Sequence, residues 1–218
     1  MKIAIIGAGR MGQALSPLFA RAGHEVRLSN SRGPESLAEL VDTLGPGVRA
    51  TTVADAVEGA DVVVLATPWG RTAEAVSSVS DWVGRVVVDA TNNRSAPGPQ
   101  GLIDIGDRVS SEIVAQYVPG AKVVKAFNVT PMPMLVPAMA SPAGDNKAFY
   151  IAGDDDDAKS LVADLIASIG GVAVDTGDLH TGGQLQGMSG PLAAPLELLT
   201  PTEARSRLAQ ARLEQAQS

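Results

Sequence analysis

The sequence predicts an α/β fold of the doubly wound Rossmann type, with a mainly parallel sheet. Short β-branched runs alternate with stretches of helical periodicity along most of the chain, which is typical of βαβ units. Two of the runs, VVVLA at 62–66 and VVVDA at 86–90, are apolar on both faces, as a parallel sheet covered by helices on each side requires. A G-x-G-x-x-G pattern directly after the first run is the third observation.

The β-branched runs define the expected strands. In order they are Lys2–Ile6, Glu25–Ser29, Asp61–Ala66, Arg85–Ala90, Lys122–Phe127 and Phe149–Gly153. Apolar residues at helical spacing, several of them after a Ser, Thr or Asp start signal, define the expected helices. These are Met11–Ala22, Pro34–Leu44, Val53–Glu58, Arg71–Ser80, Ser110–Tyr117 and Asp156–Ile169.

The end of the chain differs from the rest. The tail 202–218 is rich in Ala, Arg, Glu and Gln and predicts a helix that is solvated or packs in a dimer. The stretch before it, from residue 179, is broken by glycines and prolines. Without a repeat or a linker, we expect one domain, with a dinucleotide-binding Rossmann unit at 1–178 and a divergent segment for packing or dimer contact at 179–218.

Composition excludes several classes of function. The chain has 218 residues, a formal charge of −7 and 3% aromatic residues, which counts against nucleic acid as a partner. It has no cysteine and two histidines, which excludes thiolate sites and leaves little for zinc. The uncharged stretch 126–144 contains four prolines, so we expect a loop and no membrane anchor. The opening MKIAIIGAGR is too short an apolar run for a signal peptide, so we expect a cytoplasmic location.

The glycine pattern consists of Gly7, Gly9 and Gly12, placed between the first strand and the first helix. In this context the first glycine permits a tight turn, the second admits a pyrophosphate, and the third allows close packing of helix on strand. The N–H groups near Arg10 and Met11 would meet the phosphates. A turn that merely needs glycines is the structural alternative.

The end of the second strand indicates which dinucleotide binds. NAD sites usually carry Asp or Glu there, whereas this chain reads Asn30, Ser31 and Arg32. A hydroxyl and a guanidinium suit a 2′-phosphate, which favours NADP(H) over NAD. The alternative for Arg32 is an ordinary surface arginine.

Five motifs in order resemble a known family. These are GAGRMGQAL, SNSRGPES, ATPW at 66–69, KAFN at 125–128 and AGDDDDAKS. Together they resemble the NADP-dependent oxidoreductases of coenzyme F420, a deazaflavin, and their relatives, which include the cytosolic domain of the Steap metalloreductases. The likeness covers roughly 1–178.

The resemblance implies roles for particular residues. Gly9, Arg10 and Met11 would hold the pyrophosphate, and Ser31 and Arg32 the 2′-phosphate. Two further groups are implied at the nicotinamide: Thr67, Pro68 and Trp69 on one side, and Ala126 by the carboxamide. Such proteins pass a hydride between the nicotinamide and the deazaflavin, so positioning supplies most of the catalysis.

The second ligand is expected beyond the carboxyl ends of the strands. The segment Phe127–Gly144 would form a Met-rich, Pro-stiffened wall over a flat ring, or else a lid packed on the core or on a second subunit. The residues expected to touch this ligand are Asn92, Asn128, Pro131 and Met132. Asn92 and Asn93 are equally explained by turn formation.

Other polar and aromatic residues have simpler interpretations. Asp154–Asp157 predicts a helix cap and not a calcium site. His24 is expected to satisfy a local backbone group, and Trp82 and Trp69 to pack. No catalytic acid or base is assigned, although His180 is the histidine that could reach the site and donate a proton.

The predicted function is hydride transfer between NADP(H) and coenzyme F420 by a cytoplasmic, dimeric enzyme. Reduction of another acceptor by NADPH, such as a flavin that reduces ferric iron, or a small imine or carbonyl, is the alternative within enzymes. The Tyr-x-x-x-Lys pair of carbonyl reductases is absent, because Ala121 stands four residues after Tyr117. A non-catalytic NADPH sensor is the alternative from another class.

Overall fold

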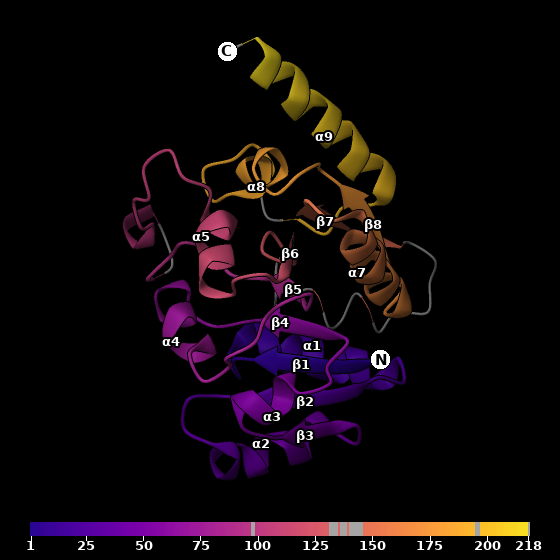
Figure 1. Ribbon diagram of the computed structural model, residues 1–218. Helices are drawn as coiled ribbons and strands as arrows, with labels where there is room; N and C mark the ends of the chain where they lie inside the picture. Colours follow the sequence, from indigo (N-terminus) through magenta and orange to yellow (C-terminus); the bar gives the residue numbers. More distant parts are fainter. Residues whose placement is uncertain (97–98, 131–134, 136–138, 140–145, 195–196, 218) are drawn as a thin grey trace.

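A computed structural model describes residues 1–96, 99–130, 135, 139, 146–194 and 197–217. Its centre is an eight-stranded sheet with the strand order β3-β2-β1-β4-β5-β6-β7-β8 (Figure 1). The strands are β1 (Lys2–Ile6), β2 (Glu25–Ser29), β3 (Val48–Ala50), β4 (Val62–Leu65), β5 (Val86–Asp89), β6 (Lys122–Ala126), β7 (Lys147–Gly153) and β8 (Gly171–Asp175). Every neighbouring pair is parallel except β6 and β7. The doubly wound, mainly parallel Rossmann fold is confirmed.

Helices connect the strands and cover both faces of the sheet. They are α1 (Arg10–Arg21), α2 (Ala38–Leu44), α3 (Val53–Val57), α4 (Thr72–Val76), α5 (Ser110–Tyr117), α7 (Asp156–Ser168), α8 (Thr181–Gln186) and α9 (Pro201–Ala216). Short 3-10 helices lie at Pro34–Leu37, Trp69–Arg71 and Pro99–Gly101. None of the helices in the described part of the chain is both long and apolar enough to cross a bilayer.

Each face of the sheet has its own apolar core. Alternate strand residues such as Ile5, Val64 and Val124 pack against α1 and α7 on one face. Their neighbours, such as Ile6 and Leu65, pack against α3, α4 and α5 on the other. This alternation is the period of two that a strand imposes, and it decides which face each polar residue of the site will occupy.

The antiparallel strand β7 runs beyond the carboxyl end of the parallel strand β6 that it pairs with. Ala126, the last residue of β6, pairs with Ile151, so the first half of β7 runs beyond the end of β6. β8 pairs with that same half, from Lys147 to Ile151. The two strands therefore form a wall beside the carboxyl edge of the parallel strands, where the loops of the site emerge.

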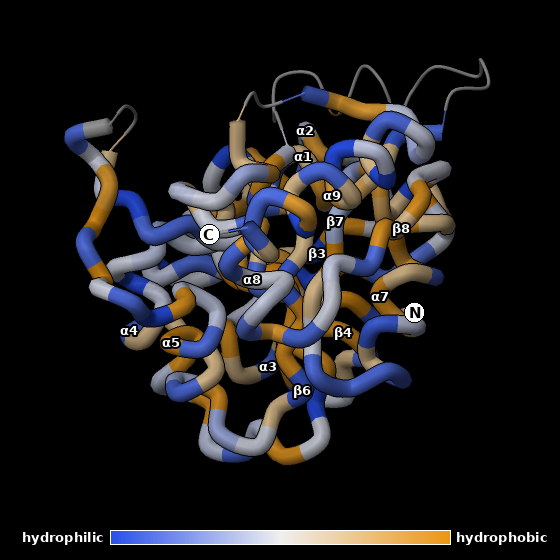
Figure 2. Tube along the Cα trace, turned by 90° about the horizontal axis from the view of Figure 1, so that it is seen from above, coloured by the Kyte–Doolittle hydropathy of each residue, from blue (hydrophilic) through white to orange (hydrophobic). Residues whose placement is uncertain are grey.

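The C-terminal segment covers this wall. A third apolar cluster joins Tyr150 and Val174 of the wall to Leu185 of α8 and Leu208 of α9. Figure 2 looks down on this end of the molecule, with α8 and the C-terminus over the middle. The predicted helix at 202–218 is thus confirmed as α9, and it packs on the same domain as the strands that precede it.

Two strands and one α-helix of the described part of the chain were not predicted. β3 and β8 are edge strands, β3 has three residues and β8 begins on a glycine, so neither shows an alternating pattern. α8 has the sequence TGGQLQ, which gives no helical periodicity. The helix expected at Arg71–Ser80 ends at Val76, and most of the expected wall Phe127–Gly144 lies outside the described residues.

Candidate functional site

The site lies at the carboxyl edge of the four central parallel strands. Ile6, Leu65, Asp89 and Lys125 stand in one row across β1, β4, β5 and β6. The loops that follow these four residues therefore begin at the same level. Such an edge, where the strand order reverses around β1 and β4, is where open α/β sheets bind ligands.

The three glycines between β1 and α1 serve three different purposes. Gly7 has φ of +116°, and a Cβ there would lie 2.5 Å from the carbonyl oxygen of Ala66. A Cβ at Gly12 would lie 2.0 Å from the carbonyl oxygen of Gly7, so the helix approaches the strand closely. A Cβ at Gly9 would meet nothing within 4 Å, and Gly9 begins α1 without a side-chain cap. The open space above Gly9, at an uncapped helix end, fits a pyrophosphate.

The loop after β2 is ordered by one asparagine. The side chain of Asn30 accepts a hydrogen bond from the N–H of Arg32 at 2.9 Å and donates to Ser36 Oγ at 2.9 Å. In this turn the side chains of Ser31 and Arg32 are exposed. The turn lies beside the glycine loop, because Gly7 donates its N–H to the carbonyl of Ser29. Both sequence-predicted phosphate contacts are thus available to a ligand.

The loop after β4 carries the next three predicted residues. Thr67 lies 2.8 Å from Thr72, hydroxyl to hydroxyl, which fixes the loop to the start of α4. Pro68 is exposed and Trp69 is half-buried against the core on the α4 face. The indole nitrogen of Trp69 is buried and has no hydrogen-bond partner in the described part of the chain.

Two asparagines join the loops after β5 and β6. Asn92 donates its amide to the carbonyl of Asn128 at 2.7 Å, and Asn128 donates to Asn92 Oδ1 at 3.3 Å and to the carbonyl of Gln186 at 2.8 Å. The side-chain oxygen of Asn128 is buried and has no partner among the described residues. Ala126 is fully buried, so only its main chain could face a ligand. The two remaining predictions, Pro131 and Met132, lie outside the described residues.

A fully buried ion pair lies directly beneath these loops. Lys125 Nζ lies 3.3 Å from Asp89 Oδ2, and neither side chain is exposed to solvent. Asp89 also accepts hydrogen bonds from the N–H and hydroxyl of Thr91 and from the hydroxyl of Ser111 at 2.5 Å. Lys125 donates to Ser111 at 2.9 Å and to Ser110 at 3.3 Å. The pair fixes the loop after β5 and the start of α5.

A cavity of about 340 Å³ opens beside this network. Its walls come from the loop before α5, from α8 and the loop after it, and from the end of α9. Asn93 and Ser110 line it next to the ends of β5 and β6. A cavity of this size is within the range for a small-molecule site.

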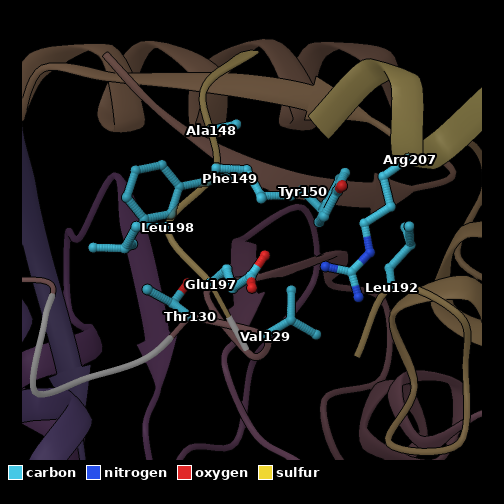
Figure 3. A pocket seen from close by; sticks show the side chains of 10 residues that line it. Val129, Thr130, Ala148, Phe149, Tyr150, Leu192, Glu197, Leu198 and Arg207 are labelled. Atoms are coloured by element: carbon cyan, nitrogen blue, oxygen red, sulfur yellow. The ribbon is translucent and has the colours of Figure 1, made fainter. Parts of the chain in front are cut away.

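A second cavity lies farther out, between β7 and α9 (Figure 3). Its volume is about 10 Å³, which is room for one water molecule. Tyr150 donates its hydroxyl to the carbonyl of Ala204 there, and burial raises the pKa of that phenol. Arg207 reaches back toward Pro191 from α9. These contacts fasten α9 to the wall and leave no room for a substrate.

The remaining predicted residues have structural partners. Asp155 caps α7 by accepting from the N–H of Ala158, and hydrogen bonds from Lys122 and Ala158 hold its pKa below the ordinary value, so the capping prediction is confirmed. His24 was expected to satisfy a local backbone group, and that is wrong, because its partners come from distant parts of the chain. Its ring contacts the N-terminal ammonium of Met1 at 3.1 Å and Ser168 Oγ at 2.8 Å, because α7 packs beside it.

His180 stands at the start of α8 and is exposed. Its Nδ1 lies 3.0 Å from Glu112 Oε1, and its Nε2 lies 3.2 Å from the amide of Gln184. The contact with Glu112 joins α8 to α5 at the surface, whereas the contact with Gln184 lies within the first turn of α8. Trp82, by contrast, is buried in the core as predicted.

Sequence reasoning missed the buried network. A signal was present, because Asp89 and Lys125 are charged residues that directly follow the apolar runs Val86–Val88 and Val123–Val124 of their strands. A buried charge needs a partner, and an opposite charge on the neighbouring parallel strand can be that partner. The cavity wall formed by α8 had no comparable signal, because its helix is rich in glycine.

Comparisons with known proteins agree with this geometry. The family model described as NADP oxidoreductase, coenzyme F420-dependent, matches residues 2–93. A crystal structure of a hypothetical protein from Sinorhizobium meliloti superposes with a TM-score of 0.83 and 42% identity, covering 91% of this chain and 96% of that one. The metalloreductase STEAP3 of Rattus norvegicus is 27% identical over 91% of this chain, which spans 37% of that protein's length.

A reductase of similar length decides the family. The F420-dependent NADP reductase of Methanothermobacter thermautotrophicus is 30% identical over 194 residues, which cover 83% of this chain and 82% of that protein. The glycine turn after β1 lies within the part that the family model matches. The chain is an NADP-dependent oxidoreductase and belongs to the family of coenzyme F420-dependent NADP oxidoreductases.

Proposed function

We propose that this chain transfers a hydride between NADP(H) and a deazaflavin, coenzyme F420. The reaction consumes NADPH, the oxidised deazaflavin and one proton, and it yields NADP⁺ and the reduced deazaflavin. Support comes from the similarity to an F420-dependent NADP reductase and from a cavity beside the carboxyl ends of the parallel strands, which we call the dinucleotide edge. When bound, the nicotinamide supplies or accepts the hydride.

The residues at the dinucleotide edge fit NADP(H). In this proposal the N–H groups at the start of α1, above Gly9, bind the pyrophosphate, and Ser31 and Arg32 bind the 2′-phosphate. The open space at Gly9 and the exposed guanidinium support these roles.

The nicotinamide half would lie along the next three loops. Thr67, Pro68 and Trp69 would flank it, with Asn92, Asn128 and the main chain of Ala126 nearby. Trp69 Nε1 and Asn128 Oδ1 are buried polar atoms without partners in the described residues, as expected of groups that a ligand satisfies. The residues thereby orient the ring and exclude water, which is the protein's part in the transfer.

The chemistry of the cavity wall is the observation that favours a flat redox ring over an imine or a carbonyl compound, and the similarity to an F420-dependent reductase favours a deazaflavin among such rings. The ionisable side chains among its described lining residues are Asp107 and Arg108, and both are exposed. Reduction of an imine or a carbonyl calls for an acid beside the acceptor atom. A flat ring that receives hydride at carbon takes up its proton at a ring nitrogen, which solvent can reach. The wall therefore fits a redox ring better than a small carbonyl compound.

The experiment is NADPH oxidation by the purified protein with one acceptor at a time. Oxidised F420, FMN and FAD are offered separately, and NADH replaces NADPH as the control donor. We expect turnover with F420 and NADPH, and little with either flavin or with NADH. Turnover with FMN alone, and reduction of ferric iron through it, would contradict the proposal and favour a flavin reductase. Tight NADPH binding without any turnover would favour a sensor.

We further propose that the enzyme is a cytoplasmic homodimer and that the segment 179–218 contributes to its contact. The support is the outer face of α9, where Leu213 is 59% exposed. Light scattering of the full chain tests the dimer, with Leu213→Asp as the variant expected to dissociate it. A monomer at all concentrations for the unaltered chain would contradict it.

A further inference from the structure

Two adjacent serines at the start of α5 face different surroundings. Ser111 is fully buried and donates its hydroxyl to Asp89 Oδ2 at 2.5 Å. Ser110 is 4% exposed and lines the 340 Å³ cavity. Both accept a hydrogen bond from the ammonium of Lys125. The network thus holds the two hydroxyls, but only one of them borders space that a ligand could enter.

The contact with Lys125 constrains the proton of Ser110. A serine hydroxyl has one proton to donate and two lone pairs to accept with. The ammonium occupies one lone pair of Ser110, and no acceptor for its proton is found in the described part of the chain. The other partner of the network, Asp89, is fully engaged by Thr91, Ser111 and Lys125. The proton of Ser110 is therefore available to a molecule in the cavity.

We propose that Ser110 donates a hydrogen bond to the hydride acceptor, at a carbonyl oxygen or ring nitrogen that becomes negative as the hydride arrives. This inference rests on the proposed function only in placing the acceptor in this cavity. A hydroxyl that already accepts from an ammonium is a stronger donor, because hydrogen bonds in a chain polarise one another. A fixed donor directed at a developing charge stabilises the transition state more than the ground state.

Lys125 and Asp89 act as positioning residues in this scheme. Burying a charged pair costs solvation energy, and two well-packed apolar residues could often replace it without loss of stability. The pair is nevertheless placed in the row that ends the strands, next to the cavity wall. Its position lets one ammonium hold Ser110, while Asp89 holds Thr91 and with it the loop that leads to Asn92 and Asn93.

The test is Ser110→Ala, with Ser160→Ala as the matched control. Ser160 is exposed on α7, which covers the other face of the sheet. For Ser110→Ala we expect kcat with the acceptor to fall about tenfold, the equivalent of one hydrogen bond, with little change in its KM. The Kd for NADPH, measured by titration without acceptor, and the Tm should stay close to those of the unaltered protein.

A double-mutant cycle separates this role from simple packing. Asp89→Asn with Lys125→Met removes both charges together and leaves no unpaired ion. If Lys125 polarises Ser110, the loss caused by Ser110→Ala should shrink to a few-fold or less in this background. A full loss in both backgrounds would overturn the positioning role of Lys125.

The outcomes distinguish this inference from the proposed function. Normal kcat in Ser110→Ala, while the unaltered protein reduces F420, would overturn the inference alone. Absence of F420 turnover in the unaltered protein would overturn the proposed function. Ser110 would then be judged by whether Ser110→Ala lowers kcat with FMN or FAD, whichever of the two the unaltered protein reduces. An unchanged kcat with that acceptor, or no turnover of the unaltered protein with any acceptor, would overturn the inference as well.

Discussion

At the scale of single residues, the turn after β1 contains one glycine that the fold requires and one that only a ligand would require. A Cβ at Gly12 would collide with the carbonyl of Gly7, whereas a Cβ at Gly9 would meet no protein atom within 4 Å. Gly9 has φ of −81°, which any residue can adopt. Nothing in the protein itself therefore requires glycine at that position.

Gly9→Ala should therefore leave the stability of the free protein unchanged and weaken NADPH by at least about tenfold, because the methyl group would occupy the space proposed for the pyrophosphate. Gly12→Ala should instead destabilise the fold by about 1–3 kcal/mol through overpacking. Urea unfolding and NADPH titration of both variants check this contrast. Equal NADPH affinity in Gly9→Ala would place the pyrophosphate elsewhere.

Arg32 provides a second test at this scale. We expect Arg32→Ala to weaken NADPH by about 1.5–3 kcal/mol, the range for a hydrogen bond to a charged group, and to leave NADH nearly unchanged. Calorimetric titration with both nucleotides measures the difference. Arg49→Ala is the control, because Arg49 is an exposed arginine of β3 that pairs with Glu25. Equal losses for NADPH and NADH would show that Arg32 does not contact the 2′-phosphate.

The same scale shows how far sequence reasoning reached at the site. The positions of Gly9, Ser31 and Arg32 could be predicted because local motifs place them, and the structure brings these residues to one edge of the sheet. The contact of Lys125 with Ser110 could not, because it joins a strand to the start of a helix 15 positions away through a packing that the sequence does not specify. Their roles depend on which face of the sheet each strand residue occupies.

At the scale of elements, predictability followed the strength of the local pattern. The central strands have several β-branched residues each and were predicted within a residue or two. β3 and β8 are short edge strands that are held by pairing with β2 and β7. Pairing of this kind is a tertiary contact, so a periodic pattern within the strand is not needed for it to form.

The C-terminal helix offers a test at this scale. Thr200 caps α9 by accepting from the N–H of Glu203, whose carboxylate bonds back to the N–H of Thr200. Thr200→Ala should reduce the free energy of unfolding by about 1 kcal/mol and lower Tm by about 2–4 °C. Thr202→Ala is the matched control, since that exposed threonine makes no side-chain hydrogen bond within the described residues. Equal Tm values for the two variants would show that α9 unfolds independently of the domain.

At the scale of the whole molecule, pH should act on stability through groups whose pKa is lowered by folding. The pKa of His24 is lowered by burial and by the N-terminal ammonium beside it. The carboxyl groups with a lowered pKa are Glu25, Asp155, Asp178 and Glu203, each through a hydrogen bond to its charged form. In every case the unfolded chain binds protons more readily than the folded one, so stability falls as the pH falls.

The fall should come in two stages. Between pH 7 and 5 the unfolded His24 takes up a proton near its ordinary pKa of 6.5 while the folded one resists. Below about 4.5 the carboxyl groups follow, and their stage should be the steeper because four of them contribute. Relief of the net charge of −7 acts in the opposite direction, so a variant is needed to isolate the histidine. His24→Gln should flatten the stage between pH 7 and 5 in urea titrations and leave the lower stage intact. The same slope in both proteins would mean that burial beside the N-terminal ammonium does not lower the pKa of His24 in solution.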